Sequence, residues 1–379
     1  MNNLLKILLF ALIISTLVST DLNAQFLDFK GMAAGWLTSG YSDQMAMQVG
    51  GRYIPQIEGI IPLKNNLTIE GEFSANFVGS YTSPIEGDKF YGKIKPYRMW
   101  MKISGNQFEI RAGLQKMNFG SATILRPLMW FDRIDPRDPL QLTDGVYGVL
   151  GRYYLLNNIN FWAWGLYGNK DTKGWEVYVT DKHSVEFGGR FQFPVPRAEI
   201  GLTYHFRKAT LPSNVSGFAD NIIFPENRLG VDIKADLGIG IWMEDVVKYQ
   251  DHGWNYPYTN MLTIGADYTF GLGNGLNIMS EHFIYQLSED LYGDDMTVNF
   301  TGLSASYPLS LTANISAILY YDWDSEELYR FLNLGLTYDR FSYYLMGFWN
   351  PERFRIFDFN TGPSLFNGTG FQIMVVYNH

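Results

Sequence analysis

The sequence predicts an all-β protein, namely a transmembrane antiparallel up-and-down β-barrel of about 18 strands, with 16 as the alternative count. Three observations predict this class. Apolar and polar residues alternate along many short segments, an export segment begins the chain, and the connections alternate between short and long. A barrel wall needs the two-residue alternation because successive side chains of a strand face lipid and lumen in turn.

The first 24 residues predict a secretory signal peptide. Lys6 precedes an apolar run over residues 7–18, and polar residues follow it. This is the layout of a cleavable export signal, and the run is shorter than the roughly 20 residues that a spanning helix needs. We expect cleavage after Ala24, which leaves residues 25–379 as a single transmembrane β-barrel domain.

The composition favours a membrane-embedded wall. Aromatic residues make up 16% of the chain and charged residues only 18%, yet no stretch after the export signal approaches a spanning helix. Within hydrocarbon every backbone N–H and C=O must be paired inside the protein, which leaves helices or closed sheets as spanning structures. The net charge of −9 argues against nucleic acid as a partner. The absence of cysteine excludes disulfides and thiolate metal sites, and no cofactor or metal is expected.

Four segments alternate most clearly, over residues 67–77, 107–115, 184–193 and 198–207, with large apolar side chains on one face and charged or amide side chains on the other. The same pattern along the whole chain predicts strands that begin near residues 27, 45, 67, 91, 107, 145, 159, 184, 198, 228, 238, 260, 276, 296, 311, 329, 341 and 370. The segments near residues 27, 238 and 296 alternate poorly.

The connections supply an independent indication. Short ones with turn residues, such as Asn65-Asn66 and Asp339-Arg340, fall between longer ones over residues 81–90, 118–144, 169–183, 208–227, 247–259 and 350–369. Bacterial barrels have short periplasmic turns and longer external loops. A water-soluble β-protein has no reason to sort its loops by length in this way. With an even number of strands, both termini are expected in the periplasm.

The polar face of the predicted wall is the candidate site, and its charge is mixed. Its members are Glu70, Glu72, Glu109, Glu186, Glu199, Asp232, Asp236, Asp267, Glu281, Arg111, Arg190, Arg207, Arg228, Lys234 and Gln115. An 18-stranded barrel is wide enough for an aqueous lumen unless side chains or loops fill it. These groups are therefore interpreted as a selectivity lining. The alternative is that they pair across neighbouring strands and only hydrate the interior.

The loop over residues 118–144 is the candidate constriction. Its charged members include Arg126, Arg133, Arg137, Asp132, Asp135 and Asp138. Loops of this length are usually functional or disordered. Its apolar residues argue against disorder, so we expect the loop to pack; they are Ile124, Leu125, Leu128, Met129, Trp130 and Phe131. Two positions are open to it, inside the lumen as a constriction or outside as an extracellular cap.

The stretch IRAGLQKMNFGSATILRPLMWFDRIDPRDP, residues 110–139, resembles a strand, turn and loop of the alginate-export-like outer-membrane porins. The matching positions are Arg111, Gln115, Gly120, Pro127, Asp135, Pro136, Arg137 and Asp138. Residues 186–207 look like a later hairpin of the same broad group. The resemblance covers a small part of the chain. It implies a porin-like transport barrel of the bacterial outer membrane and does not identify the solute.

The expected function is therefore a channel in outer-membrane lipid that passes a small hydrophilic solute, with an anion or a saccharide as the candidate classes. A transporter of hydrophobic substrates and a plugged scaffold barrel without transport are the alternatives. Whether the barrel is a monomer or a homo-oligomer is left open.

An enzyme is not expected. Ser280 and His282 share the face of one predicted strand, as in an outer-membrane phospholipase, but two side chains without a third orienting group are a weak catalytic pattern. Tryptophans such as Trp36, Trp100, Trp162 and Trp242 are interpreted as interfacial aromatic girdles, with sugar-stacking platforms as the alternative.

Overall fold

The computed structural model describes residues 27–83, 89–213, 220–352 and 365–379. The expected signal peptide and parts of the long connections predicted at residues 81–90, 208–227 and 350–369 therefore lie outside the described residues. The strands are β1 (Leu27–Tyr41), β2 (Met45–Pro62), β3 (Thr68–Ser83), β4 (Lys89–Ser104), β5 (Phe108–Gln115), β6 (Val146–Tyr154), β7 (Asn160–Leu166), β8 (Val179–Thr180), β9 (Glu186–Val195), β10 (Ala198–Leu211), β11 (Ile222–Asp236), β12 (Gly240–Gln250), β13 (Tyr258–Phe270), β14 (Leu276–Ser288), β15 (Met296–Pro308), β16 (Ala313–Asp322), β17 (Glu327–Tyr338), β18 (Phe341–Trp349) and β19 (Thr369–Asn378). Within these residues, no helix has both the length and the apolar character needed to cross a membrane.

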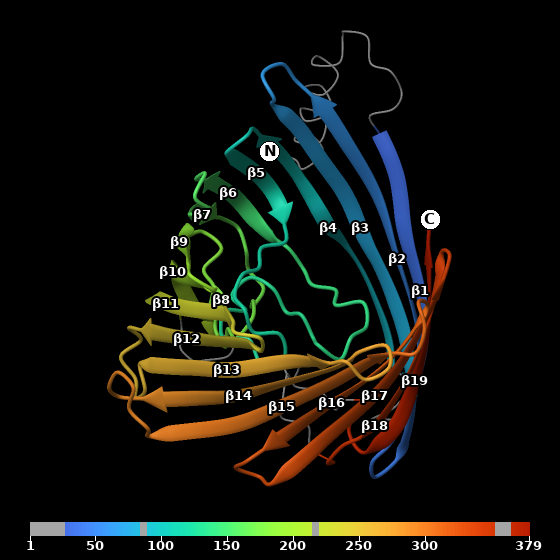
Figure 1. The fold of residues 1–379 in the computed structure, drawn as a ribbon. Coiled ribbons are helices and arrows are strands. Elements are labelled where there is room, and N and C mark those ends of the chain that lie inside the picture. Colours follow the sequence, from blue (N-terminus) through green and yellow to red (C-terminus); the bar gives the residue numbers. More distant parts are fainter. Residues whose placement is uncertain (1–26, 84–88, 214–219, 353–364) are drawn as a thin grey trace.

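The strands form one closed antiparallel wall (Figure 1). β1 pairs with β19 in a register that runs from Met32↔Asn378 to Tyr41↔Thr369. β7 pairs directly with β9, so the two-residue β8, which pairs only with β10, is not a wall strand. The wall therefore has 18 strands, as predicted. Closure leaves no sheet edge whose backbone groups would meet lipid unpaired.

The predicted strand starts are correct to within two residues for every wall strand except β11, which begins at Ile222 rather than near residue 228. The reason is the inward face at the start of β11. Phe224 points into the barrel and contacts the ring of Tyr178, with ring centroids 5.2 Å apart. An apolar side chain on the inner face removes the polar half of the alternation, so the sequence pattern does not indicate this end of the strand.

The two faces of the wall differ as the alternation predicts. On β9 and β10 the inward side chains Glu186 and Arg207 are fully buried, whereas the outward Phe187 and Leu202 are 49% and 42% exposed. Exposed large apolar side chains recur on strands all around the barrel, from Val49 on β2 to Val375 on β19. This outer surface fits hydrocarbon, and the inner surface fits water and polar partners.

The ends of the barrel also differ. One end carries turns over residues 63–67, 105–107, 155–159, 196–197, 237–239, 271–275, 309–312 and 339–340, and the other carries the long loops. Asn65 and Asn66 have φ values of 62° and 58°, the left-handed geometry of a tight hairpin turn. Two connections at the long-loop end, residues 42–44 and 323–326, are short. Both described termini lie at the short-turn end.

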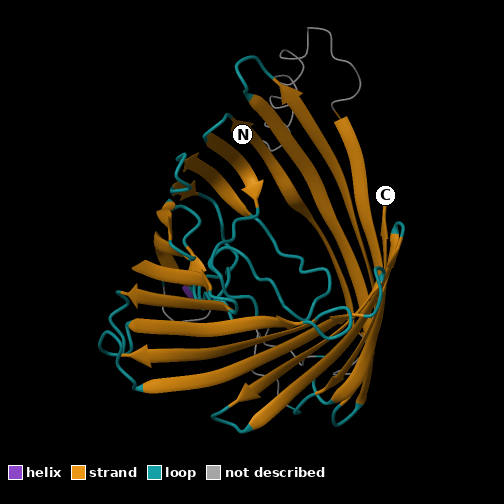
Figure 2. Ribbon diagram, viewed as in Figure 1, coloured by secondary structure: helices purple, strands orange, loops and turns teal. Residues whose placement is uncertain are grey.

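Two long loops fold into the barrel instead of extending from it (Figure 2). They are the β5–β6 loop, residues 116–145, and the β7–β9 loop, residues 167–185. An apolar core forms between the β5–β6 loop and the inner wall. Its members include Met117, Ile124, Leu125, Leu128, Trp130, Val246, Met261, Phe283, Tyr329 and Phe348. The core of this protein thus lies inside the barrel and fixes one loop against one side of the wall.

Candidate channel site

The β5–β6 loop is held by a wall carboxylate, that of Glu281 on β14. Its oxygens accept hydrogen bonds from the backbone N–H groups of Thr123, Ile124 and Leu125 at 2.7, 2.9 and 2.6 Å. The indole Nε1–H of Trp242 donates a fourth bond at 3.0 Å. Hydrogen bonds to an ionised acceptor are roughly twice as strong as neutral ones, and Glu281 is fully buried. This carboxylate is therefore a fixed anchor for residues 123–125.

The second anchor is Glu244 on β12, which is separated from β14 by the single strand β13. It accepts from the N–H groups of Ala122 and Leu128 at 2.7 and 3.0 Å. Gly120 approaches this carboxylate so closely that a Cβ at position 120 would collide with it, and its φ is +98°. The sequence therefore needs glycine at position 120 for the loop to reach the wall. Anchored at both carboxylates, the loop lies in the lumen and does not cap the barrel.

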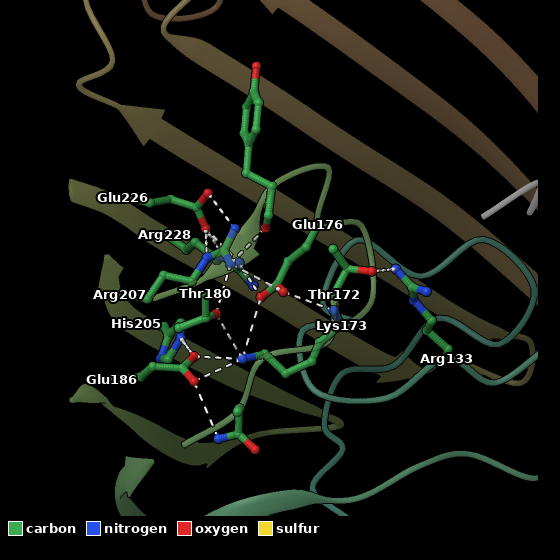
Figure 3. Close-up of polar contacts among 12 residues, drawn as sticks. Arg133, Thr172, Lys173, Glu176, Thr180, Glu186, His205, Arg207, Glu226 and Arg228 are labelled. Atoms are coloured by element: carbon green, nitrogen blue, oxygen red, sulfur yellow. Dashed lines mark hydrogen bonds and ion pairs between the residues drawn. The ribbon is translucent and has the colours of Figure 1, made fainter. Parts of the chain in front are cut away.

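The β7–β9 loop is held by a buried charge network (Figure 3). Lys173 and Glu176 come from the loop, Glu186 from β9, Arg207 from β10, and Glu226 and Arg228 from β11. Their ion pairs are Lys173–Glu186 at 2.8 Å, Arg207–Glu226 at 2.6 Å, Arg228–Glu226 at 2.6 Å, Arg228–Glu176 at 2.7 Å and Arg207–Glu176 at 3.2 Å. The guanidinium groups of Arg207 and Arg228 each contact Glu176 of the loop and Glu226 of the wall, which ties the loop to the wall.

Glu226→Gln is expected to destabilise the barrel strongly. The substitution leaves Glu176 as the one carboxylate among the described residues that pairs with both Arg207 and Arg228. Arg207 and Glu226 are both 0% exposed. Breaking a buried ion pair costs about 3–5 kcal/mol. The measurement is urea unfolding of the refolded barrel in lipid, followed by the gel shift between folded and unfolded forms. Glu199→Gln is the control, because Glu199 is exposed and, among the described residues, accepts a side-chain hydrogen bond only from Gln192. Equal losses for the two variants would contradict the prediction.

Two polar cavities lie beside the β5–β6 loop, and Asp138 lines both. The first, of about 710 Å³, lies toward the long-loop end between this loop, the β7–β9 loop and the inner face of β2–β4. The second, of about 540 Å³, lies toward the short-turn end between the loop and the inner face of β15–β18. The two cavities thus lie on either side of the loop, toward opposite ends of the barrel, and Asp138 is the lining residue that they share.

The predicted loop residues form mostly local contacts. Arg126 pairs with Asp132 at 2.9 Å and Arg137 with Asp135 at 2.6 Å, while Arg133 donates to the hydroxyl of Thr172 at 2.7 Å. Asp138 accepts from the N–H of Leu140 at 2.9 Å. Burial raises the pKa of Asp138 and lowers the pKa of Arg133. Of these six residues, Asp132, Arg133 and Asp138 line the first cavity.

The predicted wall residues lie on the inner face as expected, and several are paired there. Arg190 binds Asp232 at 2.5 Å, Arg207 binds Glu226, Glu186 binds Lys173, Glu109 binds Arg152 at 2.9 Å, and Glu199 accepts from Gln192. Gln115 donates to the carbonyls of Arg111 and Gly148, and the guanidinium of Arg111 lies 4.7 Å from the ring centroid of Trp100. Whether any of them selects solutes stays a prediction.

Sequence reasoning found Arg133 but missed the anchor Glu244 and the other five cations of the first cavity, which are Arg52, Lys93, Lys95, Lys170 and Lys173. Glu244 lies in the β12 segment that alternates poorly, since its inward neighbours Trp242 and Val246 are apolar. Trp242 and Val246 are apolar because the β5–β6 loop, and not water, covers that part of the inner face.

The girdle interpretation is wrong for several tryptophans, which point into the lumen. Trp36 donates to Gln48, Trp100 to Glu72 and Trp242 to Glu281, at 3.0, 2.9 and 3.0 Å. Trp162 lies under Arg152, with 3.7 Å between the guanidinium carbon and the ring centroid. Inward tryptophans pack against the loops or stack on inner arginines, so they do not mark the membrane interfaces.

Ser280 and His282 point outward from β14, and His282 Nδ1 lies 2.9 Å from Thr301 Oγ1. No carboxylate pairs with His282 in the described part of the chain. Nor do the described residues contain a group of three or more histidine, aspartate or glutamate side chains that could hold a metal ion.

Comparisons with known proteins agree with this architecture. No family model and no curated protein matches the sequence. Among solved structures, an anion-selective porin from Comamonas acidovorans superposes with a TM-score of 0.53 at 14% identity, covering 93% of this chain and 99% of that one. OccK5 (OpdH) of Pseudomonas aeruginosa gives 0.55 at 9% identity, with 93% and 98% covered. OccAB1 of Acinetobacter baumannii gives 0.54 at 10% identity, with 93% and 96% covered.

The chain has the fold of outer-membrane porins. At these identities the likeness concerns the fold alone, and the alginate-export-like family is not confirmed by it. Within this porin fold, the inward β5–β6 loop and the two cavities beside it define which part of the lumen is filled and which is open.

Proposed function

We propose that this porin-fold barrel is a channel of the bacterial outer membrane through which small hydrophilic solutes diffuse. The observation that carries the proposal is the pair of polar cavities that lie beside an anchored loop toward opposite ends of the barrel and share Asp138 in their linings. An apolar outer wall and a polar inner path are what a solute channel needs in a membrane. Removal of residues 1–24 on export is part of the proposal.

The lining of the path supports a hydrophilic solute. The second cavity is bordered by hydroxyl and amide side chains, including those of Ser310, Asn314 and Asn333, and Asp138 is its one charged residue within the described chain. A transporter of hydrophobic substrates would need an apolar path, and the apolar core is instead filled by the loop. We further propose that the protein has no enzymatic role, with Ser280 and His282 as outward-facing wall residues.

The test is single-channel recording of the refolded mature chain in planar bilayers at symmetric 1 M KCl. Stable stepwise conductance is expected, together with swelling of proteoliposomes in arabinose. Bilayers that stay silent in the presence of protein shown to be folded by the gel shift would favour the plugged scaffold. Swelling unaffected by solute size up to large oligosaccharides would contradict a path restricted by the loop.

A further inference from the structure

The first cavity has more basic than acidic side chains in a chain whose net charge is −9. Its basic lining residues are Arg52, Lys93, Lys95, Arg133, Lys170 and Lys173, and its acidic ones are Asp132, Asp138, Asp144 and Asp171. The excess of positive charge is therefore local to this cavity. It occurs where the path is bordered by the β5–β6 and β7–β9 loops.

Ion pairing removes some of these charges from the path. Lys95 binds Asp144 at 2.5 Å, while Asp132 and Lys173 bind Arg126 and Glu186, which lie outside the lining. The lining keeps a positive excess after this pairing. Even with Arg133 left out, the bases Arg52, Lys93 and Lys170 outnumber the acids Asp138 and Asp171.

Three of the remaining cations have no carboxylate within ion-pair distance in the described part of the chain. They are Arg52 on β2, Lys93 on β4 and Lys170 on the β7–β9 loop, so they approach the cavity from different elements. Their charges therefore act on the cavity without being neutralised by a paired carboxylate.

We infer that the first cavity selects small anions, carboxylates or inorganic phosphate among them, with Arg52, Lys93 and Lys170 as the specificity-determining residues. This inference rests on the proposed function and names its solute class. Guanidinium and ammonium groups donate charge-assisted hydrogen bonds to carboxylate and phosphate oxygens. Among the described residues, the lining of the second cavity contains no base, so discrimination is set in the first.

The experiment is the reversal potential in a KCl gradient across a planar bilayer, for the wild type and for Arg52→Gln, Lys93→Gln and Lys170→Gln. Chloride is expected to permeate better than potassium in the wild type. Each neutralisation is expected to lower the chloride-to-potassium permeability ratio about fivefold, because a unit charge roughly 8 Å away in water shifts anion and cation occupancy in opposite directions. Added inorganic phosphate or succinate is expected to reduce the chloride current of the wild type and less so that of the variants.

Two controls separate selectivity from folding. Lys64→Gln removes the same charge from the exposed short turn at residues 63–67 and is expected to leave the ratio unchanged. Arg52→Lys keeps the charge and is expected to keep the anion preference. No conductance in any folded variant would refute the proposed channel, whereas conductance with a ratio of one or below in the wild type would overturn the anion inference alone.

Discussion

Deletion of residues 121–142 is expected to raise the single-channel conductance at least about threefold, since an 18-stranded barrel without a loop in its lumen leaves a wide aqueous channel. The β5–β6 loop fills one side of the lumen and borders both cavities. The deletion is sterically possible because Gln115 and Val146, at the ends of β5 and β6, are register partners. The measurement is the conductance distribution in planar bilayers at symmetric 1 M KCl.

The wall is expected to survive this deletion because its backbone ladder closes without the loop. Glu244 and Glu281 then face water, which can hydrate both carboxylates. Folding is checked by the gel shift, and a larger sugar cutoff in proteoliposome swelling is the second readout. A folded deletion variant with unchanged conductance would show that the loop does not restrict the path.

The fold followed from the sequence because a barrel wall imposes a strictly local pattern. Each strand must alternate regardless of what its distant partners are, so the segment over residues 198–207 predicts β10 by itself. The exceptions were positions where the inner face meets protein instead of water. Phe224 on β11 and Trp242 on β12 point into the barrel yet are apolar, because the folded-in loops cover them.

The candidate site was less accessible to the same reasoning. Alternation predicts that Arg111 and Glu186 face inward. It does not predict that Glu186 binds Lys173, which belongs to another segment. The loop's position depended on contacts between residues more than a hundred positions apart, such as Ile124 with Glu281. The cation Arg52 lies in a segment with adjacent glycines, Gly50 and Gly51, which gave no indication that it would face a cavity.

Glu281→Ala is expected to release the β5–β6 loop and to destabilise the barrel. It removes the acceptor of three consecutive backbone N–H groups and of the Trp242 indole. Each buried donor left without an acceptor costs about 1–3 kcal/mol. We expect a fall of about 3 kcal/mol in the free energy of unfolding, because water entering the site satisfies some of the donors. Urea unfolding in lipid measures it.

Loop release has two signatures that a general loss of stability does not produce. The open-channel current is expected to fluctuate between the wild-type level and larger levels, because a detached loop moves in and out of the path. Trypsin is expected to cleave after Arg133, which is only partly exposed in the anchored loop. Glu199→Ala serves as the matched control, since Glu199 is a wall glutamate that does not contact the loop. A quiet, protease-resistant Glu281→Ala channel would show that the apolar packing of Leu125 and Trp130 alone holds the loop.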